Sequence, residues 1–494
     1  MCNSPRTASI HVLDDDSLLH VFYLYRPFLF GEDESGAARL YGGNGRWADG
    51  HWWYKLAHVC QRWRNVILGS TSYLGVSLVC TGDTPVAEML AYSPPLPLVV
   101  DYYRVHDITA EDEEAITIAL KQRDRVSRVR LHIPVTSLQK LIGAMDDEYP
   151  ALEYLVILLP IEDNSSVIIF PETFQAPRLR HLMLRGFAFP IGCRLMTTTA
   201  SLVTLCLIMR NPSSYFRPNT LLQWLSFMPQ LETLLVGFVF AFPSRYVEGP
   251  LTNMPIITHV TLPNLRHLWF QGVTTYLEAL VRRITAPRLG KLQIRLRNQL
   301  TYSVPRLLQF MSTSDNLRFD SARFEFFKDL IVKFYSRTEP ETYPLSISVG
   351  CWHLDWQVSA ASQVFNSLRQ RFSAVEHLTF EHKVHSQSSE EHNEVDRIEW
   401  RNLLRPFSKV KTLRIDEGLV KDLSRCLELE DGELPLEVLP ELQELTYSGS
   451  GDTGAAFTSF IDARRNTECP ITLVFPNSSP NPYSSSSVSI NPAN

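Results

Sequence analysis

The chain has 494 residues, of which 45% are hydrophobic and 20% are charged, and its formal net charge at pH 7 is −6. This length favours a small module followed by an elongated array of repeats over one compact domain. Acidic and basic residues are mixed along the chain, which argues against a nucleic-acid-binding surface built from clustered cations.

Membrane insertion and secretion are not expected from the sequence. No apolar run approaches the roughly 18 residues of a membrane-spanning helix, and the first residues contain no apolar signal core. The eight cysteines are scattered without a C-x-x-C pair, a pattern typical of reduced thiols. We therefore expect an intracellular protein, cytoplasmic or nuclear, with no membrane partner.

Two helices are predicted near the N-terminus. Residues 1–9 are expected to be disordered, and Asp14 to Asp16 offer N-cap carboxylates for a helix through Leu18, Leu19 and Phe22. A polar, glycine-rich insertion follows at residues 27–50. Helical periodicity then predicts one helix over residues 52–68, with an apolar stripe formed by Leu56, Val59, Cys60, Trp63, Val66 and Ile67.

The run LAHVCQRWRNVI, residues 56–67, preceded by LDDDSLLHVFYLY, residues 13–25, resembles an F-box. That family is a short helical module that docks a receptor onto the adaptor subunit of a cullin-type ubiquitin ligase. Asp14 departs from the family, which usually has proline there, and the segment between the two halves is longer than usual. The resemblance implies a module over residues 10–70 whose adaptor-binding positions are Leu13, Leu18, Leu19, Phe22, Val59, Cys60 and Trp63.

Residues 71–125 are expected to link this module to the repeats and to cap them. A strand over 74–80, a short helix over 85–91 and a strand over 98–102 are predicted in that order. Thr109 with Asp112 three residues later forms a capping box that opens a further helix.

From residue 126 to 475 the chain repeats the template L-x-x-L-x-L, with helical stretches between most of the matches. We expect each match to be a strand, and Leu345 to Val349 to be one more. The template begins at Val126, Leu152, Leu179, Leu202, Leu231, Leu265, Leu289, Ser321, Val375, Val410 and Leu442.

One strand and one helix per repeat is the leucine-rich-repeat unit. The predicted fold class is therefore α/β: a helical F-box-like module followed by an irregular leucine-rich-repeat solenoid with a parallel concave sheet and convex helices. The layout as a whole, over about residues 10 to 475, resembles the F-box proteins with degenerate leucine-rich repeats that are abundant in fungi. Residues 476–494 have little apolar content and are expected to be disordered.

Three motifs suggest chemistry, and each has a structural alternative. Gly449, Gly451 and Gly454 follow a strand as in a dinucleotide site, but a glycine-rich repeat loop is the favoured interpretation because the rest of that fold is missing. A cluster of four histidines is interpreted as a solvated loop and not as a metal site: His377, His382, His385 and His392. Cys60 is interpreted as a packed thiol. No enzyme active site, cofactor or metal is predicted.

The predicted function is that of a substrate-recognition subunit of a cullin-type ubiquitin ligase, with the repeats holding an unidentified target protein. The alternative is a leucine-rich-repeat scaffold that is not coupled to ubiquitination. An enzyme using the glycine loop is a third and less favoured interpretation.

The target is predicted to sit on the strands. In each template the last two residues face the core, so the residue between them faces outward by the period of two. These outward positions are Arg130, Val156, Met183, Cys206, Leu235, Trp269, Gln293, Glu325, Thr379, Arg414 and Thr446.

The middle of that series is apolar and is flanked by arginines, as in a protein-binding patch. The alternative is that a long loop folds over the patch and makes it core. The predicted target-binding residues are Met183, Arg185, Leu235, His267, Trp269, Gln271 and Arg295.

Overall fold

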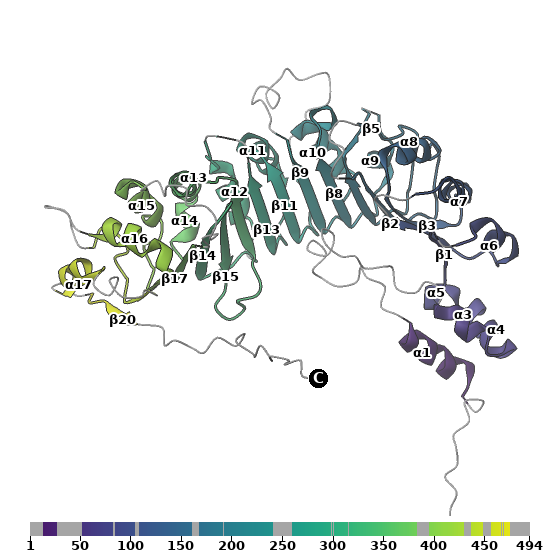
Figure 1. Ribbon diagram of the computed structural model, residues 1–494, viewed down its shortest axis with the longest axis horizontal. Helices are drawn as coiled ribbons and strands as arrows, with labels where there is room; N and C mark the ends of the chain where they lie inside the picture. The colour runs from purple at the N-terminus through teal and green to yellow at the C-terminus, as the bar shows by residue number, and fades with distance from the viewer. Residues whose placement is uncertain are drawn as a thin grey trace, which may run out of the picture. The chain divides into compact units, whose positions relative to one another are not determined.

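The computed structural model describes residues 13–26, 52–103, 108–160, 167–240, 259–382, 395–428, 436–447 and 456–474, apart from residues 83, 191, 298, 300, 315, 466 and 468. The predicted disordered ends, the insertion 27–50, the three glycines of the 449–454 motif, His385 and His392 lie outside these residues. The chain divides into two compact units, Met1–Phe240 and Ala241–Asn494. Each is a mixed α/β unit in which helices accompany a mostly parallel sheet (Figure 1).

The first unit begins with helices and continues as alternating strands and helices. Its sheet has the order β1-β2-β3-β4-β6-β8-β9, and neighbouring strands are parallel throughout. The strands β5 and β7 form a separate parallel pair. The strands are β1 (Leu78–Cys80), β2 (Leu98–Tyr103), β3 (Val126–His132), β4 (Tyr154–Leu158), β5 (Ile168–Ile169), β6 (His181–Arg185), β7 (Phe187–Ala188), β8 (Thr204–Met209) and β9 (Thr233–Phe238). The helices are α1 (Asp15–Tyr25), α3 (Trp52–Ala57), α4 (Gln61–Gly69), α5 (Thr71–Leu74), α6 (Val86–Tyr92), α7 (Ala110–Leu120), α8 (Val135–Gly143), α9 (Leu195–Thr198) and α10 (Pro218–Ser226), with a 3-10 turn at Pro212–Ser214.

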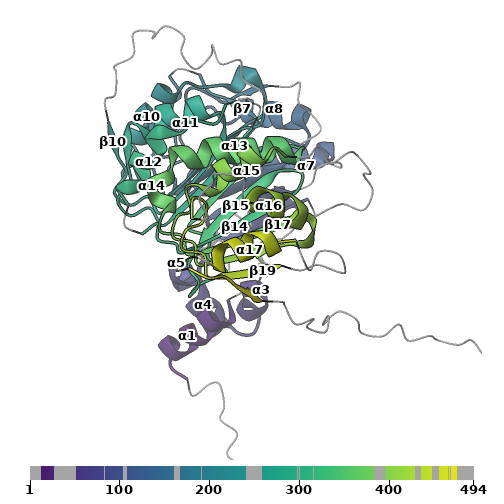
Figure 2. The same ribbon diagram turned by 90° about the vertical axis from the view of Figure 1, so that its left-hand side faces the viewer.

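The second unit continues the alternation around a sheet of order β11-β13-β16-β15-β14-β17-β18-β19-β20, beside a short parallel pair of β10 and β12. The strands are β10 (Val260–Thr261), β11 (His267–Gly272), β12 (Ile284–Thr285), β13 (Lys291–Leu296), β14 (Ser321–Phe326), β15 (Leu330–Tyr335), β16 (Leu345–Val349), β17 (His377–His382), β18 (Thr412–Ile415), β19 (Glu444–Tyr447) and β20 (Thr472–Val474). The helices are α11 (Thr274–Val281), α12 (Pro305–Ser312), α13 (Leu354–Ser367), α14 (Arg369–Phe372), α15 (Arg397–Leu404), α16 (Val420–Leu427) and α17 (Thr458–Arg465), with a 3-10 turn at Glu417–Leu419. Figure 2 shows α13 and α15 lying side by side over this sheet.

The template residues form the core, as the sequence predicts. Leu182 and Leu184 of β6 are 0% exposed, and so are Leu268 and Phe270 of β11. Each template match contributes to a strand, and Leu345 to Val349 forms β16. The alternation of buried positions within the strands follows from the period of two.

A recurring turn leads into the strands of both units. In six repeats a proline occupies the second position of a four-residue turn whose last residue is the first template leucine. Proline suits that position because its ring presets φ. The turn hydrogen bond runs from the leucine N–H to the carbonyl three residues earlier, at 3.0–3.3 Å, in Tyr149–Leu152, Ala176–Leu179, Met228–Leu231, Leu262–Leu265, Ala286–Leu289 and Leu439–Leu442.

Both predicted helix starts are confirmed. The carboxylate of Asp14 accepts a hydrogen bond from the backbone N–H of Ser17 at 2.7 Å, and this bond holds the pKa of Asp14 below its ordinary value. In the capping box, Asp112 N donates to Thr109 Oγ1 at 3.1 Å, and Thr109 N donates back to Asp112 Oδ2 at 3.0 Å.

The strand predicted over residues 74–80 is wrong in its first half. Residues 71–74 form α5, whose C-cap Gly75 has φ 63°. A left-handed residue ends a helix at little cost when it is glycine, so the chain turns there before β1 begins.

Strand β15 departs from the predicted parallel sheet. It is antiparallel to both neighbours, β14 and β16. The three strands β14, β15 and β16 form a meander. Its outer strands pair in parallel with β17 and with β13, respectively. Because the meander has an odd number of strands, the parallel direction is restored on both sides of it.

Candidate interaction surfaces

The N-terminal helices pack around an aromatic contact between α1 and α4. Phe22 meets Trp63 edge to face, with ring centroids 4.9 Å apart. Leu18 lies one turn earlier on the same face of α1, and Leu18 and Phe22 are 0% and 1% exposed. On the rim of this contact, Arg62 Nε donates to Asp15 Oδ1 at 2.8 Å. These contacts hold α1 against α4.

The single helix predicted over residues 52–68 is broken into α3 and α4. Cys60, between them, has an extended backbone, with φ −160° and ψ 168°. Arg64 Nε donates to the carbonyl of Ala57 at 3.1 Å, which supplies a donor to the C-terminal end of α3. Val59 therefore leaves the predicted apolar stripe and is 58% exposed.

The predicted adaptor-binding residues divide into core and surface. Leu18 and Phe22 are buried in the module itself, where their apolar area is used in packing, and their assignment to an adaptor stays a prediction. Of the others, Leu13 and Val59 are exposed, whereas Leu19, Cys60 and Trp63 are half-buried.

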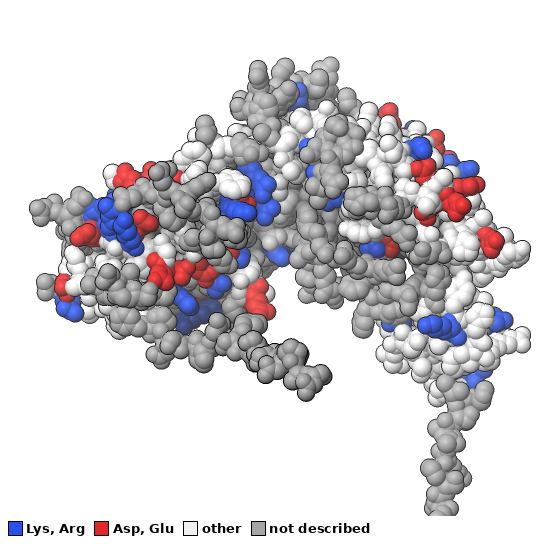
Figure 3. All heavy atoms as spheres, viewed as in Figure 1, with Lys and Arg blue, Asp and Glu red and all other residues white. Residues whose placement is uncertain are grey.

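An outward apolar stripe on α1 was missed from the sequence. Val21, Leu24 and Tyr25 are 44%, 70% and 58% exposed; Val21 and Tyr25 follow Leu18 by three and seven positions and so flank the buried Leu18–Phe22 face, and Leu24 lies beyond them. We call these three residues the outer stripe. The signal for it was the unbroken apolar run of residues 21–25, which extends the apolar surface of α1 beyond the Leu18–Phe22 face. In Figure 3 the visible face of the N-terminal helices is largely uncharged, with Lys and Arg among the neutral residues.

The strand face of the first unit carries the apolar row of the predicted target site. Val156, Met183, Cys206 and Leu235 are in direct register across β4, β6, β8 and β9. They are 4%, 5%, 0% and 0% exposed, so the expectation of a water-exposed patch is wrong for these positions. The strands that carry them are apolar on both faces, the pattern of strands buried on both sides. Burial also raises the pKa of the Cys206 thiol to about 12.

Beside this row lies a nearly buried ion pair. Arg130 of β3 donates from Nε and Nη2 to the two carboxylate oxygens of Asp101 of β2, at 2.7 and 2.6 Å. The side chains are 15% and 8% exposed, and Arg130 also lies over the ring of Tyr103 at 5.2 Å. Such a bidentate pair satisfies both charges in a site with little water.

Four of the five remaining predicted target residues are half-buried, and the fifth is buried. Arg185, in the first unit, is half-buried and donates from Nε to the carbonyl of Leu159 at 3.1 Å. In the second unit, His267, Trp269 and Gln271 of β11 are in register with Lys291, Gln293 and Arg295 of β13. His267, Trp269 and Arg295 are half-buried, and Gln271 is buried. The assignment of these residues to a target stays a prediction.

We expect His267 to make stability depend on pH. Its burial, and the charge of nearby Lys291, lower its pKa to about 4, although the hydrogen bond with Gln293 opposes the shift. In the unfolded chain the pKa of this histidine is near 6.5. Between about pH 6.5 and 4, His267 is therefore protonated in the unfolded chain and neutral in the folded chain. The wild-type urea midpoint should therefore fall more steeply than that of His267→Gln as pH drops through this window, and the two curves should run parallel above about pH 7.5. Parallel curves throughout would show that His267 titrates normally.

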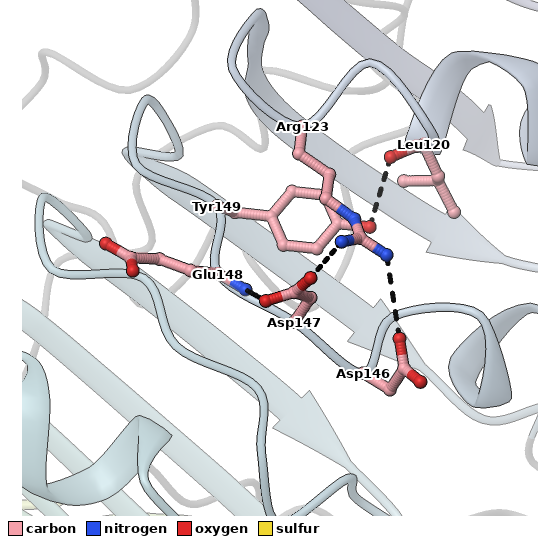
Figure 4. A network of polar contacts seen from close by, with 6 residues as sticks. All are labelled: Leu120, Arg123, Asp146, Asp147, Glu148 and Tyr149. Carbon is pink, nitrogen blue, oxygen red and sulfur yellow. Dashed lines mark hydrogen bonds and ion pairs between the residues drawn. The ribbon is translucent and has the colours of Figure 1, made fainter.

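A polar network ties two helix-to-strand loops of the first unit together (Figure 4). Arg123 forms ion pairs with Asp146, at 3.7 Å, and with Asp147. Tyr149 Oη donates to the carbonyl of Leu120 at 3.1 Å, and burial raises the Tyr149 pKa to about 12. The neighbouring cavity of about 420 Å³ is lined by residues 121–125, Asp147 and Glu148, which carry both signs of charge. We assign this network a structural role.

The described part of the chain holds no cluster of three or more His, Cys, Asp and Glu side chains arranged for a metal ion. Burial raises the pKa of the thiols of Cys80 and Cys193 to about 12 and about 11. Within the described ranges, no helix has the length and apolar character needed to cross a bilayer.

The comparisons with known proteins give a weak structural similarity and no match to a family or a curated protein. No family model matches the chain, and no curated protein matches it. The solved structure of LegL7, a leucine-rich repeat-containing protein from Legionella pneumophila, is similar to it at 10% sequence identity and a TM-score of 0.26, over 76% of this chain and 90% of that chain.

Proposed function

We propose that the chain is a substrate receptor of a cullin-type ubiquitin ligase, with the N-terminal helices binding the adaptor and the strand–helix repeats binding a target protein inside the cell. In this proposal the chain catalyses nothing itself. The F-box resemblance of residues 13–25 and 56–67 supports the first part, and the leucine template supports the second. We infer that the repeats are degenerate leucine-rich repeats, because the template residues are buried in the strands and the same turn precedes six of them.

The outer stripe is the observation that carries the proposal. Apolar side chains beside and beyond the buried Leu18–Phe22 face of a helix are not required for the packing of that face. Val21 and Tyr25, which flank that face, and Leu24, which lies beyond it, nevertheless remain exposed. An exposed apolar stripe on a short helix is the surface expected of a docking module.

We predict that Leu24→Arg weakens adaptor binding. Leu24 is 70% exposed, so the substitution changes the surface without disturbing the core. A central apolar contact is worth about 2 kcal/mol, or roughly 30-fold in Kd. The measurement is calorimetric titration of the full chain with the purified adaptor.

The matched control is Ile169→Arg, which replaces an apolar side chain of similar exposure, 65%, on β5. It should bind the adaptor like the wild type. Equal binding by Leu24→Arg and Ile169→Arg would remove the outer stripe from the interface, and a wild-type chain that does not bind the adaptor would refute the receptor proposal.

A repeat scaffold without a ligase is the second candidate, and one contact favours it. Trp53 of α3 is 4% exposed and donates from Nε1 to the carbonyl of Ser77, just before β1, at 3.1 Å. The N-terminal helices are thus bonded to the start of the sheet, as a cap would be. Absence of adaptor binding by the intact wild-type chain would favour this candidate.

A further inference from the structure

The start of the second unit is basic in a chain whose formal net charge at pH 7 is −6. Acidic and basic residues are mixed along most of the chain, but between Glu248 and Asp315 there is a single acidic residue, Glu278. The same stretch contains eight basic residues: Arg266, Arg282, Arg283, Arg288, Lys291, Arg295, Arg297 and Arg306. Such a local excess of positive charge attracts anionic partners.

The single carboxylate of this stretch is used inside the fold. Glu278 of α11 accepts hydrogen bonds from the backbone N–H groups of Arg306, at 2.7 Å, and Leu307, at 3.0 Å, at the start of α12. The first N–H groups of a helix have no acceptor within that helix, so Glu278 supplies one. Burial raises the pKa of Glu278, and these two hydrogen bonds oppose the shift. Its charge therefore serves the start of α12 and not the cations at the strands.

Three of the cations lie together where β11 and β13 begin. These strands are neighbours in the sheet (Figure 1), and Arg266 directly precedes β11. The carbonyl of Arg266 accepts a hydrogen bond from the N–H of Lys291, the first residue of β13, at 2.9 Å. Arg288, in the turn before β13, donates from Nη1 to Asn264 Oδ1 at 3.2 Å. We call Arg266, Arg288 and Lys291 the basic edge.

The basic edge is accessible, and the described part of the chain does not neutralise it. Arg266 and Arg288 are exposed, and Lys291 is half-buried. Within the described ranges, none of the three forms an ion pair with a carboxylate. Burial lowers the pKa of Lys291. Partial burial of a cation without a counter-ion costs free energy, and an anion bound beside Lys291 would recover part of that cost.

The surroundings of the basic edge favour an acidic protein segment over a membrane or a nucleic acid. Membrane docking adds exposed apolar side chains to a basic surface, and single-stranded nucleic acids stack on exposed aromatic rings. Among the described residues between 259 and 314, no large hydrophobic side chain is exposed. A duplex-binding surface contacts more phosphates than the basic edge has cations.

We propose that the basic edge binds an acidic segment of the target protein, with Arg266, Arg288 and Lys291 facing its Asp and Glu side chains. Arginine holds a carboxylate through paired N–H donors, and lysine acts as a point charge. These contacts steer an acidic segment toward the start of the strands and select it over neutral or basic segments. The inference rests on the proposed function, because it names the chemistry of the target.

The test measures binding of a fluorescently labelled decaglutamate peptide to the intact chain by fluorescence polarisation. At low ionic strength the wild type should bind this peptide and should not bind a decaglutamine peptide. Raising sodium chloride from about 0.05 to about 0.5 M shortens the Debye length from roughly 14 to roughly 4 Å and should remove most of the binding. Failure of the wild type to bind decaglutamate at low ionic strength would overturn the proposal.

Two triple variants with the same change in charge separate the basic edge from net charge. Arg266→Gln with Arg288→Gln and Lys291→Gln should bind decaglutamate at least about tenfold more weakly, since each surface charge contributes roughly two- to fivefold. The matched control, Arg369→Gln with Lys409→Gln and Arg414→Gln, changes exposed residues on α14, before β18 and on β18. It should bind like the wild type. Equal Kd values for the two triple variants would contradict the proposal.

A labelled oligothymidylate is titrated in parallel under the same conditions. If it binds the wild type more tightly than decaglutamate does, the ligand is a nucleic acid, and the assignment to an acidic protein segment is wrong. Because no adaptor is present, none of these results depends on the ligase proposal, which is decided by the adaptor titration.

Discussion

Phe22→Ala should unfold the N-terminal helices without unfolding the repeats. Phe22 is 1% exposed and packs on Trp63, and truncation of such an aromatic side chain costs about 3–5 kcal/mol. The module is small, so this loss is a large share of its stability. Hydrogen exchange measured by mass spectrometry should show lost protection in peptides covering α1 and α4, with β6 and β8 unchanged.

Val21→Ala is the control, because Val21 is on the same helix but 44% exposed. It should change protection little. If Phe22→Ala keeps its exchange protection and loses only adaptor binding, Phe22 is an interface residue, and its burial contributes little to the stability of the module.

Asp101→Ala should strongly destabilise the sheet of the first unit. It leaves Arg130, 15% exposed, as a charge without its bidentate partner. Removing one member of a buried pair costs about 3–5 kcal/mol, and we expect the lower end because Arg130 retains some contact with water. The urea midpoint of the first unit, followed by exchange protection of β2 and β3, should fall accordingly.

The double variant Asp101→Leu with Arg130→Met tests the cause. Replacing both charges with apolar groups of similar size is often neutral or stabilising. The double variant should therefore be more stable than Asp101→Ala alone. If it is less stable, the pair contributes through its geometry, including the contact of Arg130 with Tyr103.

The strands were largely predictable because the template places two buried residues on one face of each strand. Leu182 with Leu184 and Leu268 with Phe270 show this alternation. The sequence pattern does not indicate whether a strand runs parallel or antiparallel to its neighbours. β15 reads LIVKFY, and Leu330, Val332 and Phe334 are buried in alternation, which a parallel or an antiparallel strand satisfies equally.

Exposure of the interaction surfaces was less predictable. A period of two assigns Met183 and Leu235 to the face away from the template core, but it does not say whether that face is covered. Similarly, the apolar spacing over residues 52–68 does not reveal the helix break at Cys60. Apolar residues recur at helical intervals on both sides of that break. The side chain that makes the break tolerable, Arg64, bonds back to Ala57, and nothing in the spacing indicates this contact.

The meander of β14, β15 and β16 has a consequence for how the chain emerges during synthesis. Most neighbouring strands join nearby segments: His267 of β11 pairs with Lys291, 24 residues later, but Leu292 of β13 pairs with Leu345, 53 residues later. The β14–β15 hairpin needs only local contacts and can therefore form first. The edge of β13 that pairs with β16 stays unpaired until β16 has been synthesised. An unpaired strand edge is a template for association with other chains. We expect the nascent chain to be most in need of chaperone protection while the ribosome translates residues 297–345.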